Sequence, residues 1–492
     1  MIAGKASETL RFLHPIILVL SFVLTLSVCM TLTPGLLAIA ETARTMDAFL
    51  LTGVLCLILA ALGFATTMGR TFQVSSMQLY LITVSSWCVF AVVGAAPLYL
   101  ALPALSFTNA FFESMSGITT TGSTVLIGLD SMPHSLLLWR GILQWVGGVG
   151  IIMLGIAILP FLRVGGMRLF STESSDWSSK SLPNAHNLIQ NIGIVYIGIT
   201  LLACLSYYLA GMGLFDAIVH AMSTVSTGGF SNYDASVGYF GDNPAILWVG
   251  SLFMLLGSLP FGLYVSAMHG KPGLILTDSQ VRGFLGFVVL VVLLLSTERL
   301  LHSDVSVMQS LTHSAFNVIS IITTTGYVSE DYTLWGSYAV VVFFYLMFVG
   351  GCSGSTAGAI KVFRFQIAFV LLRNQLHLMR HPHAIFKTKY NGREVSDDIV
   401  RSIVAFSFYF AFTIAVLTFC LSLTGLNFLT SFSASVTAVT NVGPGLGEVV
   451  GPAGNFSSLS DMAKWLLTAG MLMGRLEIMT VLVLFTRTFW KV

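Results

Sequence analysis

Four short glycine-centred segments recur along the chain, and each follows a short apolar stretch. Their central glycines are Gly122, Gly228, Gly326 and Gly443, which lie 106, 98 and 117 residues apart. Glycine tolerates backbone conformations that turn successive carbonyl groups toward one side of the chain. If four such segments met on one axis, their carbonyl oxygens would form a ring that can replace the water around a cation.

The residues that precede each glycine could add further oxygen ligands. Thr or Ser stands two residues before the first three glycines, and Asn441 stands there before the fourth. Glycines that let two helices pack closely would explain one isolated segment, but four equivalent segments favour a cation site. The predicted ligands are Thr120, Thr121, Gly122, Ser226, Thr227, Gly228, Thr324, Thr325, Gly326, Asn441, Val442 and Gly443.

The composition identifies the elements that must hold these segments. The chain has 492 residues, of which 55% are hydrophobic and 9% charged, and its mean hydropathy is +0.87. Soluble proteins of average composition are about 25% charged. We therefore expect an integral membrane protein built of helices. The six cysteines are scattered without metal-ligand spacing, so they predict no metal site.

Ten apolar runs approach or exceed the length of roughly 20 residues that crosses a bilayer. They are 13–33, 47–67, 78–100, 134–160, 187–211, 244–268, 283–300, 334–350, 399–424 and 463–488. Four shorter stretches, 106–117, 214–225, 312–322 and 429–439, each precede a glycine-centred segment. The order span, short helix, loop, span thus occurs four times from residue 78. It predicts an all-α polytopic membrane protein with four repeated units around a central pore, preceded by two extra helices.

This pattern also predicts the domain boundaries and the orientation in the membrane. The extra helix pair should occupy 1–70, and the four repeats 71–180, 181–278, 279–395 and 396–492. Loops that follow the glycine-centred segments are acidic, whereas the opposite side holds Arg163, Arg168, Lys180 and a basic run from Lys361 to Arg401. Positive loops face the cytoplasm. Both termini are therefore expected inside, with the glycine-centred loops opening outside.

Longer motifs agree with these segments. They include Trp139-Arg140, Gln144 to Gly150, Gly350 to Gly358 with Lys361, and Gly474 to Glu477. The chain resembles the Trk/Ktr/HKT superfamily of potassium transporters, and is most similar to its bacterial TrkH/TrkG branch. That resemblance implies potassium as the transported ion, location in the bacterial inner membrane, a homodimer, and a cytoplasmic regulator of the TrkA type on which a nucleotide acts. Glycine at all four positions matches potassium-selective members, but no segment has the full Thr-Val-Gly-Tyr-Gly signature of potassium channels.

The resemblance also implies a gate below the glycine-centred segments. Gly, Ser and Thr interrupt a span at 350–358, and the spacing to Lys361 does not fit a phosphate-binding loop. Packing glycines are the alternative interpretation. Arg475 is predicted to lie mid-span, where a charge is costly and usually functional, although it could instead pair with another helix for structure. The predicted gate residues are Gly350, Gly351, Ser353, Gly354, Ser355, Thr356, Gly358 and Arg475.

Other ionisable residues in the apolar runs are predicted to be structural. Arg140 is expected to pair with Glu113 inside the protein, and His220 and His313 to be satisfied core residues. The segment Phe363 to Arg393 is predicted to be a basic amphipathic helix, a docking face for the regulator, or both.

We interpret the chain as a potassium uptake protein and not an enzyme, with no bound cofactor and no nucleic-acid partner. A sodium- or proton-coupled secondary transporter of another solute is the alternative, although such folds usually have two inverted halves instead of four like repeats. Passive and coupled uptake both remain open at this point.

Overall fold

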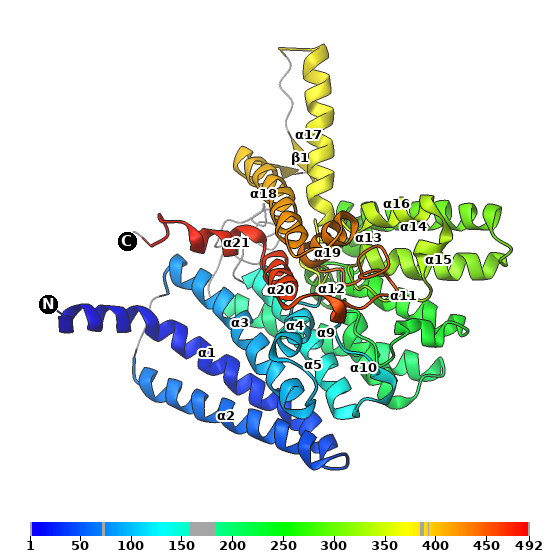
Figure 1. The fold of residues 1–492 in the computed structure, drawn as a ribbon. Coiled ribbons are helices and arrows are strands. Elements are labelled where there is room, and N and C mark those ends of the chain that lie inside the picture. The colour runs from blue at the N-terminus through cyan, green and yellow to red at the C-terminus, as the bar shows by residue number, and fades with distance from the viewer. Residues whose placement is uncertain (1, 71–73, 158–182, 384–387, 392, 491–492) are drawn as a thin grey trace.

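The computed structural model describes residues 2–70, 74–157, 183–383, 388–391 and 393–490, and these are mostly helical (Figure 1). The end of the predicted span 134–160 lies outside the described residues, as do Arg163, Arg168 and Lys180 of the charge argument. A small antiparallel hairpin, β1 (Lys389–Tyr390) and β2 (Arg393–Glu394), pairs Lys389 with Glu394.

The two extra N-terminal helices are α1 (Ile2–Ala38) and α2 (Ala43–Thr67), which pack along each other and against α3 (Ser76–Ala101). The turn between them ends where the Thr42 hydroxyl accepts a hydrogen bond from the N–H of Thr45, which caps α2. Both helices are long and apolar enough to cross a membrane. They lie at the lower left of Figure 1, beside the remaining helices.

The four predicted repeats are present as successive groups of helices. The first comprises α3, α4 (Phe107–Ile118) and α5 (His134–Ala157). The second comprises α9 (Pro183–Leu209), α10 (Leu214–Val225), α11 (Pro244–Ser258) and α12 (Phe261–Met268). The third comprises α14 (Ser279–His302), α15 (Val307–Ile322), α16 (Ser337–Leu346) and α17 (Val362–Arg380). The fourth comprises α18 (Asp397–Ser422), α19 (Phe428–Thr440), α20 (Asp461–Arg475) and α21 (Ile478–Leu482).

Short elements connect the repeats and close their loops. The five-residue helix α13 (Gly273–Thr277) links the second repeat to the third. Single 3₁₀ turns follow the glycine-centred segments or end the chain: η1 (Leu129–Ser131), η2 (Ser236–Phe240), η3 (Tyr332–Trp335), η4 (Phe456–Ser458) and η5 (Val483–Phe485).

The short helices α4, α10, α15 and α19 lie inside the protein instead of facing lipid. Ser106, Ser306 and Asn427 cap three of them by accepting hydrogen bonds from backbone N–H groups of the first turn. Most of their residues, polar ones included, are buried. A helix of 12 to 16 residues is too short to cross the hydrocarbon core, so each ends within it and must continue as loop. The residues that follow each helix as far as the glycine are mostly buried, as a non-helical backbone within a membrane requires.

The second long helix differs from one repeat to the next. In the first repeat α5 is continuous, but α11 and α12 are bent by 90° after Ser258, and α20 and the helical segment Ile478–Phe485 by 113° after Arg475. The prediction of unbroken spans at 244–268 and 463–488 was therefore wrong. Pro260 explains the first bend, because it lacks an N–H and forces Leu259 into extended backbone.

The third repeat departs furthest from a simple span. Its predicted span 334–350 contains the ten-residue helix α16, which ends at Leu346, and the chain then runs as loop until α17 begins at Val362. Figure 1 shows α17 extending away from the other helices, with β1 beside its base. Among the described residues, seven helices can cross a membrane singly, and the two bent pairs would raise that number to nine.

Candidate functional site

The four glycine-centred segments share one backbone conformation, which fixes their true alignment. Left-handed backbone occurs at a residue after each short helix and again at a glycine two residues later. The first positions are Thr120, Thr227, Thr324 and Asn441, with φ of 52°, 50°, 57° and 55°. The second positions are Gly122, Gly229, Gly326 and Gly443, with φ of 85°, 80°, 82° and 103°. In the second repeat the equivalent glycine is therefore Gly229, and the sequence alignment on Gly228 was wrong by one residue.

Backbone hydrogen bonds give the same register. The N–H one residue before each of these glycines donates to a carbonyl five residues earlier, at distances between 2.8 and 3.2 Å. The donors are Thr121, Gly228, Thr325 and Val442, and the acceptors are Ser116, Ser223, Ser320 and Thr437. A hydroxyl residue thus stands six positions before the glycine in every repeat. Counted from Gly228, the same position falls on Met222, and this mismatch was the available sign of the error.

The four segments meet in a closed cycle of backbone contacts. A Cβ atom added to Gly122 would overlap the carbonyl oxygen of Gly228 in the next repeat. Likewise, Gly229 lies against the carbonyl of Thr325, Gly326 against that of Val442, and Gly443 against that of Thr121. Because the fourth contact returns to the first repeat, the segments surround one axis. Glycine is required both for its positive φ and for this close approach.

Neutral polar groups hold the segments in place. The Thr119 and Thr121 hydroxyls are 2.8 Å apart, and Thr323 and Thr325 repeat this pair at 2.8 Å. The fourth segment is joined to the first, because the Ser123 hydroxyl donates to the Gly443 carbonyl at 2.9 Å and the Asn441 amide to the Thr121 hydroxyl at 2.8 Å. Such bonds fix the backbone without introducing charge.

The predicted gate residues of 350–358 form a loop seated on the bend between α11 and α12. The N–H groups of Cys352 and Thr356 donate to the carbonyls of Ser258 and Gly257, and the N–H of Phe261 donates to the carbonyl of Gly354. Other hydrogen bonds hold the remaining residues. The N–H groups of Gly350 and Ser353 donate to the Ile360 carbonyl and to Gln280 Oε1, and the Ser355 hydroxyl donates to the Cys352 carbonyl. The Gly351 carbonyl accepts from the N–H of Val362. The break in the second repeat thus makes room for the loop of the third.

The same loop contacts three of the four glycine-centred segments. The Thr227 hydroxyl donates to the Thr356 hydroxyl at 3.1 Å, and the N–H of Gly358 donates to the Thr324 hydroxyl at 2.6 Å. The N–H of Ala359 donates to the carbonyl of Thr440 at 2.9 Å. All three contacts are to residues at the helix-proximal end of a segment.

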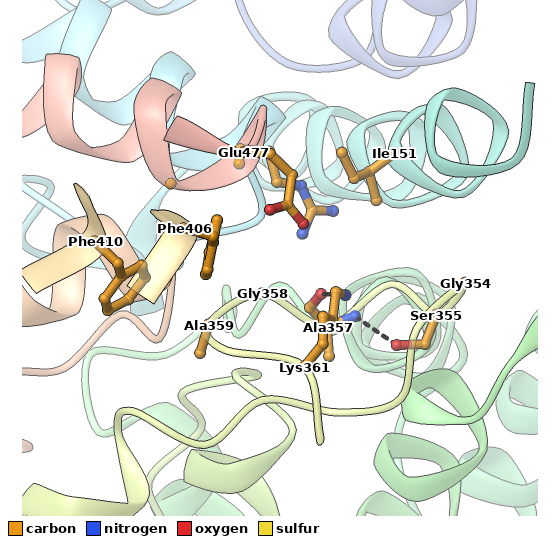
Figure 2. Close-up of a pocket in the computed structure, with 12 residues that line it drawn as sticks. Ile151, Gly354, Ser355, Ala357, Gly358, Ala359, Lys361, Phe406, Phe410 and Glu477 are labelled. Carbon is orange, nitrogen blue, oxygen red and sulfur yellow. Dashed lines mark hydrogen bonds between the residues drawn. The ribbon is translucent and has the colours of Figure 1, made fainter. Parts of the chain in front are cut away.

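Charged residues gather below this loop around a small cavity of about 30 Å³ (Figure 2). Arg475, which is 3% exposed, donates to the carbonyls of Thr356 at 2.8 Å and Gly147 at 3.4 Å. It is the last residue of α20, at the bend, and thus lies between the two halves of the predicted span 463–488. Lys361 donates to the carbonyl of Ala357.

One carboxylate faces these cations. Figure 2 shows Glu477 on one side of the cavity, with Lys361 and Ala357 on the other. Glu477 pairs with Arg364 at 2.7 Å, and Arg364 also lies over the Phe406 ring, with its Cζ atom 3.7 Å from the ring centroid. Three buried cations and one carboxylate therefore lie together. Sequence reasoning had not assigned Lys361, Arg364 or Glu477 to the gate.

The predicted pair of Arg140 and Glu113 is confirmed, with a distance of 2.9 Å between Nε and Oε1 and both side chains buried. Glu113 also accepts from the N–H of Val125, and Arg140 donates to the carbonyl of Ser231, both at 2.9 Å. The pair therefore joins the chain segments that follow the first two glycine-centred loops. His220 is a buried, hydrogen-bonded core residue, as predicted, and contacts the Ser231 hydroxyl. His313 is 15% exposed, and it contacts the Ser329 hydroxyl and lies 3.2 Å from the Glu330 carboxylate.

Acidic residues on the loops that follow the glycine-centred segments serve partly as structural contacts. Asp234 accepts hydrogen bonds from the N–H groups of Gly128 and Leu129 in the preceding repeat, and Glu330 pairs with Arg299. Tyr233 donates to Asp216 at 2.9 Å. Burial raises the pKa of the Tyr233 phenol, and the Asp216 carboxylate raises it further, so this group stays a hydrogen-bond donor.

Comparison with known proteins places this geometry in a family. The sequence profile of the TrkH family, described as cation transport protein, matches residues 45–491. The chain belongs to the TrkH family. As a TrkH-family member, it is 50% identical over 488 residues to the Trk system potassium uptake protein TrkI of Halomonas elongata, with 99% of each chain covered.

More distant family members cover nearly the whole chain as well. The Trk system potassium uptake protein TrkH of Escherichia coli K12 is 36% identical over 463 residues, which are 93% of this chain and 95% of that protein. The crystal structure of the potassium transporter TrkH from Vibrio parahaemolyticus superimposes with a TM-score of 0.90 at 34% identity, covering 97% of this chain and 99% of that one. These relatives are named as transporters and not as enzymes, and the fold is that of a helical membrane protein.

Proposed function

We propose that this chain takes up potassium across the bacterial inner membrane through the ring formed by its four glycine-centred segments. The closed cycle of contacts between each glycine and the next segment's carbonyl is the observation on which the proposal rests. Its relatives are named potassium uptake proteins, which supports potassium as the transported ion. In this proposal potassium is cargo, and it loses water where backbone oxygens can replace that water.

The proposed ligands follow the corrected register. They are Thr120, Thr121 and Gly122, then Thr227, Gly228 and Gly229, then Thr324, Thr325 and Gly326, and finally Asn441, Val442 and Gly443. Ser226 drops out of the set, because it corresponds to Thr119, Thr323 and Thr440 at the ends of the helices. All of these ligands are neutral oxygens, which suit a monovalent cation that must bind and leave quickly.

We further propose that the loop 350–358 is the gate. The N–H of Gly358 donates to the Thr324 hydroxyl, so the loop competes for the oxygen of a proposed ligand, and the adjoining N–H of Ala359 donates to the Thr440 carbonyl. Arg475 and Lys361 hold the loop through its own carbonyls. Their charges would oppose a cation that leaves the ring, because charge interactions are strong where water is excluded. Opening then requires the loop and these cations to move together.

The remaining assignments extend this proposal. Both termini lie in the cytoplasm, where a nucleotide-binding regulator of the TrkA type acts on the gate. The relatives are named Trk system proteins, which supports a system of several components. The loop continues directly into α17, so a regulator that moved α17 would also move the loop.

We also propose that α17 mediates homodimer formation. Its exposed apolar residues follow a spacing of four, three, four and three, which is the pattern of a helix that packs against a second helix. They are Phe365, Phe369, Leu372, Leu376 and Met379, which are between 41% and 75% exposed. A second copy of the chain would cover this row with an identical one.

Flux in reconstituted liposomes tests the function. Under an imposed potassium gradient, the protein with its regulator should carry rubidium tracer without a sodium or pH gradient if uptake is passive. Strict dependence on either gradient would favour coupled transport instead, and complete impermeability would contradict the proposal. Deleting 351–358 should make flux independent of the regulator. Normally regulated flux in that deletion would remove the gate assignment.

A further inference from the structure

The second glycine-centred segment is built differently from the other three. At the position before the ring glycine, Thr121, Thr325 and Val442 carry side chains, whereas the second repeat has Gly228. Gly228 and Gly229 are adjacent, so this backbone is the most flexible of the four. An unsupported pair of glycines would let the Gly228 carbonyl turn away from the ring.

The side chain of Gln144 fills the space that Gly228 leaves open. A Cβ atom added to Gly228 would overlap Cδ of Gln144 and lie 2.5 Å from its Oε1 and 2.8 Å from its Nε2. Gln144 belongs to α5 of the preceding repeat and is fully buried. The two residues are thus complementary in shape.

Gln144 also binds the segment at three points. Its Nε2 donates to the Gly228 carbonyl at 2.5 Å, and its Oε1 accepts from the Ser223 hydroxyl at 2.7 Å and from the N–H of Phe230 at 3.0 Å. These partners lie before, within and after the glycine pair. Because a carbonyl oxygen has two lone pairs, the Gly228 oxygen can accept this bond and still face the ring.

From this arrangement we infer that Gln144 is a positioning residue for ion selectivity. It sets the place of one of the four ring carbonyls and replaces, from a neighbouring helix, the support that Thr119 and Thr323 give to the first and third segments. The inference rests on the proposed potassium function. It adds that selectivity depends on a residue outside all four segments.

The test is a double-mutant cycle on Gln144→Ala and Gly228→Ala, with the ratio of rubidium to sodium flux in liposomes as the readout. This ratio is independent of how much protein inserts and how often the gate opens. We expect Gln144→Ala to lower the ratio by about tenfold, which corresponds to one lost hydrogen bond to a buried acceptor. Gln190→Ala, an exposed glutamine of α9, is the matched control and should leave the ratio unchanged.

Gly228→Ala alone should also lower the ratio, because the new Cβ meets Gln144. In the double variant, the methyl group added by Gly228→Ala occupies the space that the Gln144 side chain has vacated, so the ratio should exceed that of Gly228→Ala alone. Alanine is permitted there because the φ of Gly228 lies outside the left-handed region.

An unchanged ratio in Gln144→Ala would overturn the inference, and so would equal effects of Gly228→Ala in both backgrounds. A lowered melting temperature with an unchanged ratio would show that Gln144 only stabilises the fold. If wild-type protein carries both ions without preference, the inference fails while the proposed uptake stands. If it carries neither, the proposed function itself fails.

Discussion

The ring of glycine-centred segments and the region below it, around the cavity beside the loop 350–358, contain different kinds of polar group. The ring is held by backbone carbonyls, hydroxyls and amides, all of them neutral. The region below holds Lys361, Arg364, Arg475 and Glu477, all largely buried. Neutral oxygens can discriminate between cations by geometry, whereas buried charges change the energy of any cation equally. We therefore expect changes in the ring to alter which ion passes, and changes below it to alter how fast.

The two regions also differ in symmetry, because the ring is fourfold and the region below it is not. The ring repeats one backbone conformation four times, but the second helices below it are continuous, bent, opened into a loop and bent again. Four like neighbours suit a spherical ion on an axis. A gate needs a part that can move alone, and among the described residues the loop 350–358 that we propose as the gate is found in the third repeat only.

Breaking the ring should have the largest effect. Gly229→Ala would place a Cβ against the Thr325 carbonyl and force alanine into left-handed backbone, which by itself costs about 1–2 kcal/mol. Potassium flux should be nearly abolished. Gly262→Ala, where an added Cβ meets no atom within 4 Å, is the matched control. Normal, selective flux in Gly229→Ala would contradict the corrected register.

Glu113 and Arg140 are charged residues near the otherwise neutral ring. Their charges cancel, so the pair tests whether a neutralised pair there affects stability more than transport. Glu113→Gln would leave Arg140 buried without its counter-charge, so the free energy of unfolding should fall by about 3–5 kcal/mol. Thermal unfolding in detergent measures this. The double variant Glu113→Leu with Arg140→Met should recover much of the loss, and the absence of any recovery would mean that the hydrogen bonds of the pair matter more than its charges.

Below the ring, removing charge should raise the rate without changing the preference. Arg475→Ala should increase potassium uptake by about tenfold, because a unit charge near the path at an effective dielectric of about 20 contributes roughly 1–2 kcal/mol. Arg475→Lys keeps the charge and should keep the slow rate. Unchanged or lower uptake at equal expression would count against the barrier, and an altered rubidium-to-sodium ratio would blur the distinction between the two regions.

The smallest effect on transport is expected outside both regions. Leu372→Asp on α17 should weaken homodimer formation by about 2 kcal/mol per chain, the value of burying one leucine, while flux per chain stays close to that of the wild type. Cross-linking or light scattering in detergent measures the association. Arg373→Asp, an exposed neighbour off the apolar row, is the control. A dimer that survives Leu372→Asp would assign the row to another partner.

Much of the fold was readable from the sequence because it rests on length and hydropathy. Short helices such as α4 and α19 were located within a few residues, and the pair of Glu113 and Arg140 was anticipated. The bends after Ser258 and Arg475 were missed, because apolar runs continue through them. The one-residue shift at Gly229 was missed because two adjacent glycines are equivalent in a sequence. The predicted domain boundaries stay predictions.

The pairing of Glu477 with Arg364, and the cavity that Glu477 shares with Lys361, could not be predicted, since Glu477 lies more than 100 positions from both. Gln144 was noticed as part of a motif, but nothing in its neighbours points to Gly228. Side chains that complete a site from another repeat become visible only when the repeats are placed together. The periodicity of a sequence predicts which face of a helix is buried, but it does not predict which residues of another helix contact that face.

The bond between the Ser123 hydroxyl and the Gly443 carbonyl joins residues 320 positions apart. During synthesis, a chain that has emerged only through its third repeat lacks the fourth segment. The three segments then form an open arc, because the fourth segment contacts both the third and the first. Contacts of such long sequence separation form late. The ring of four segments is therefore complete only once the fourth repeat has been translated.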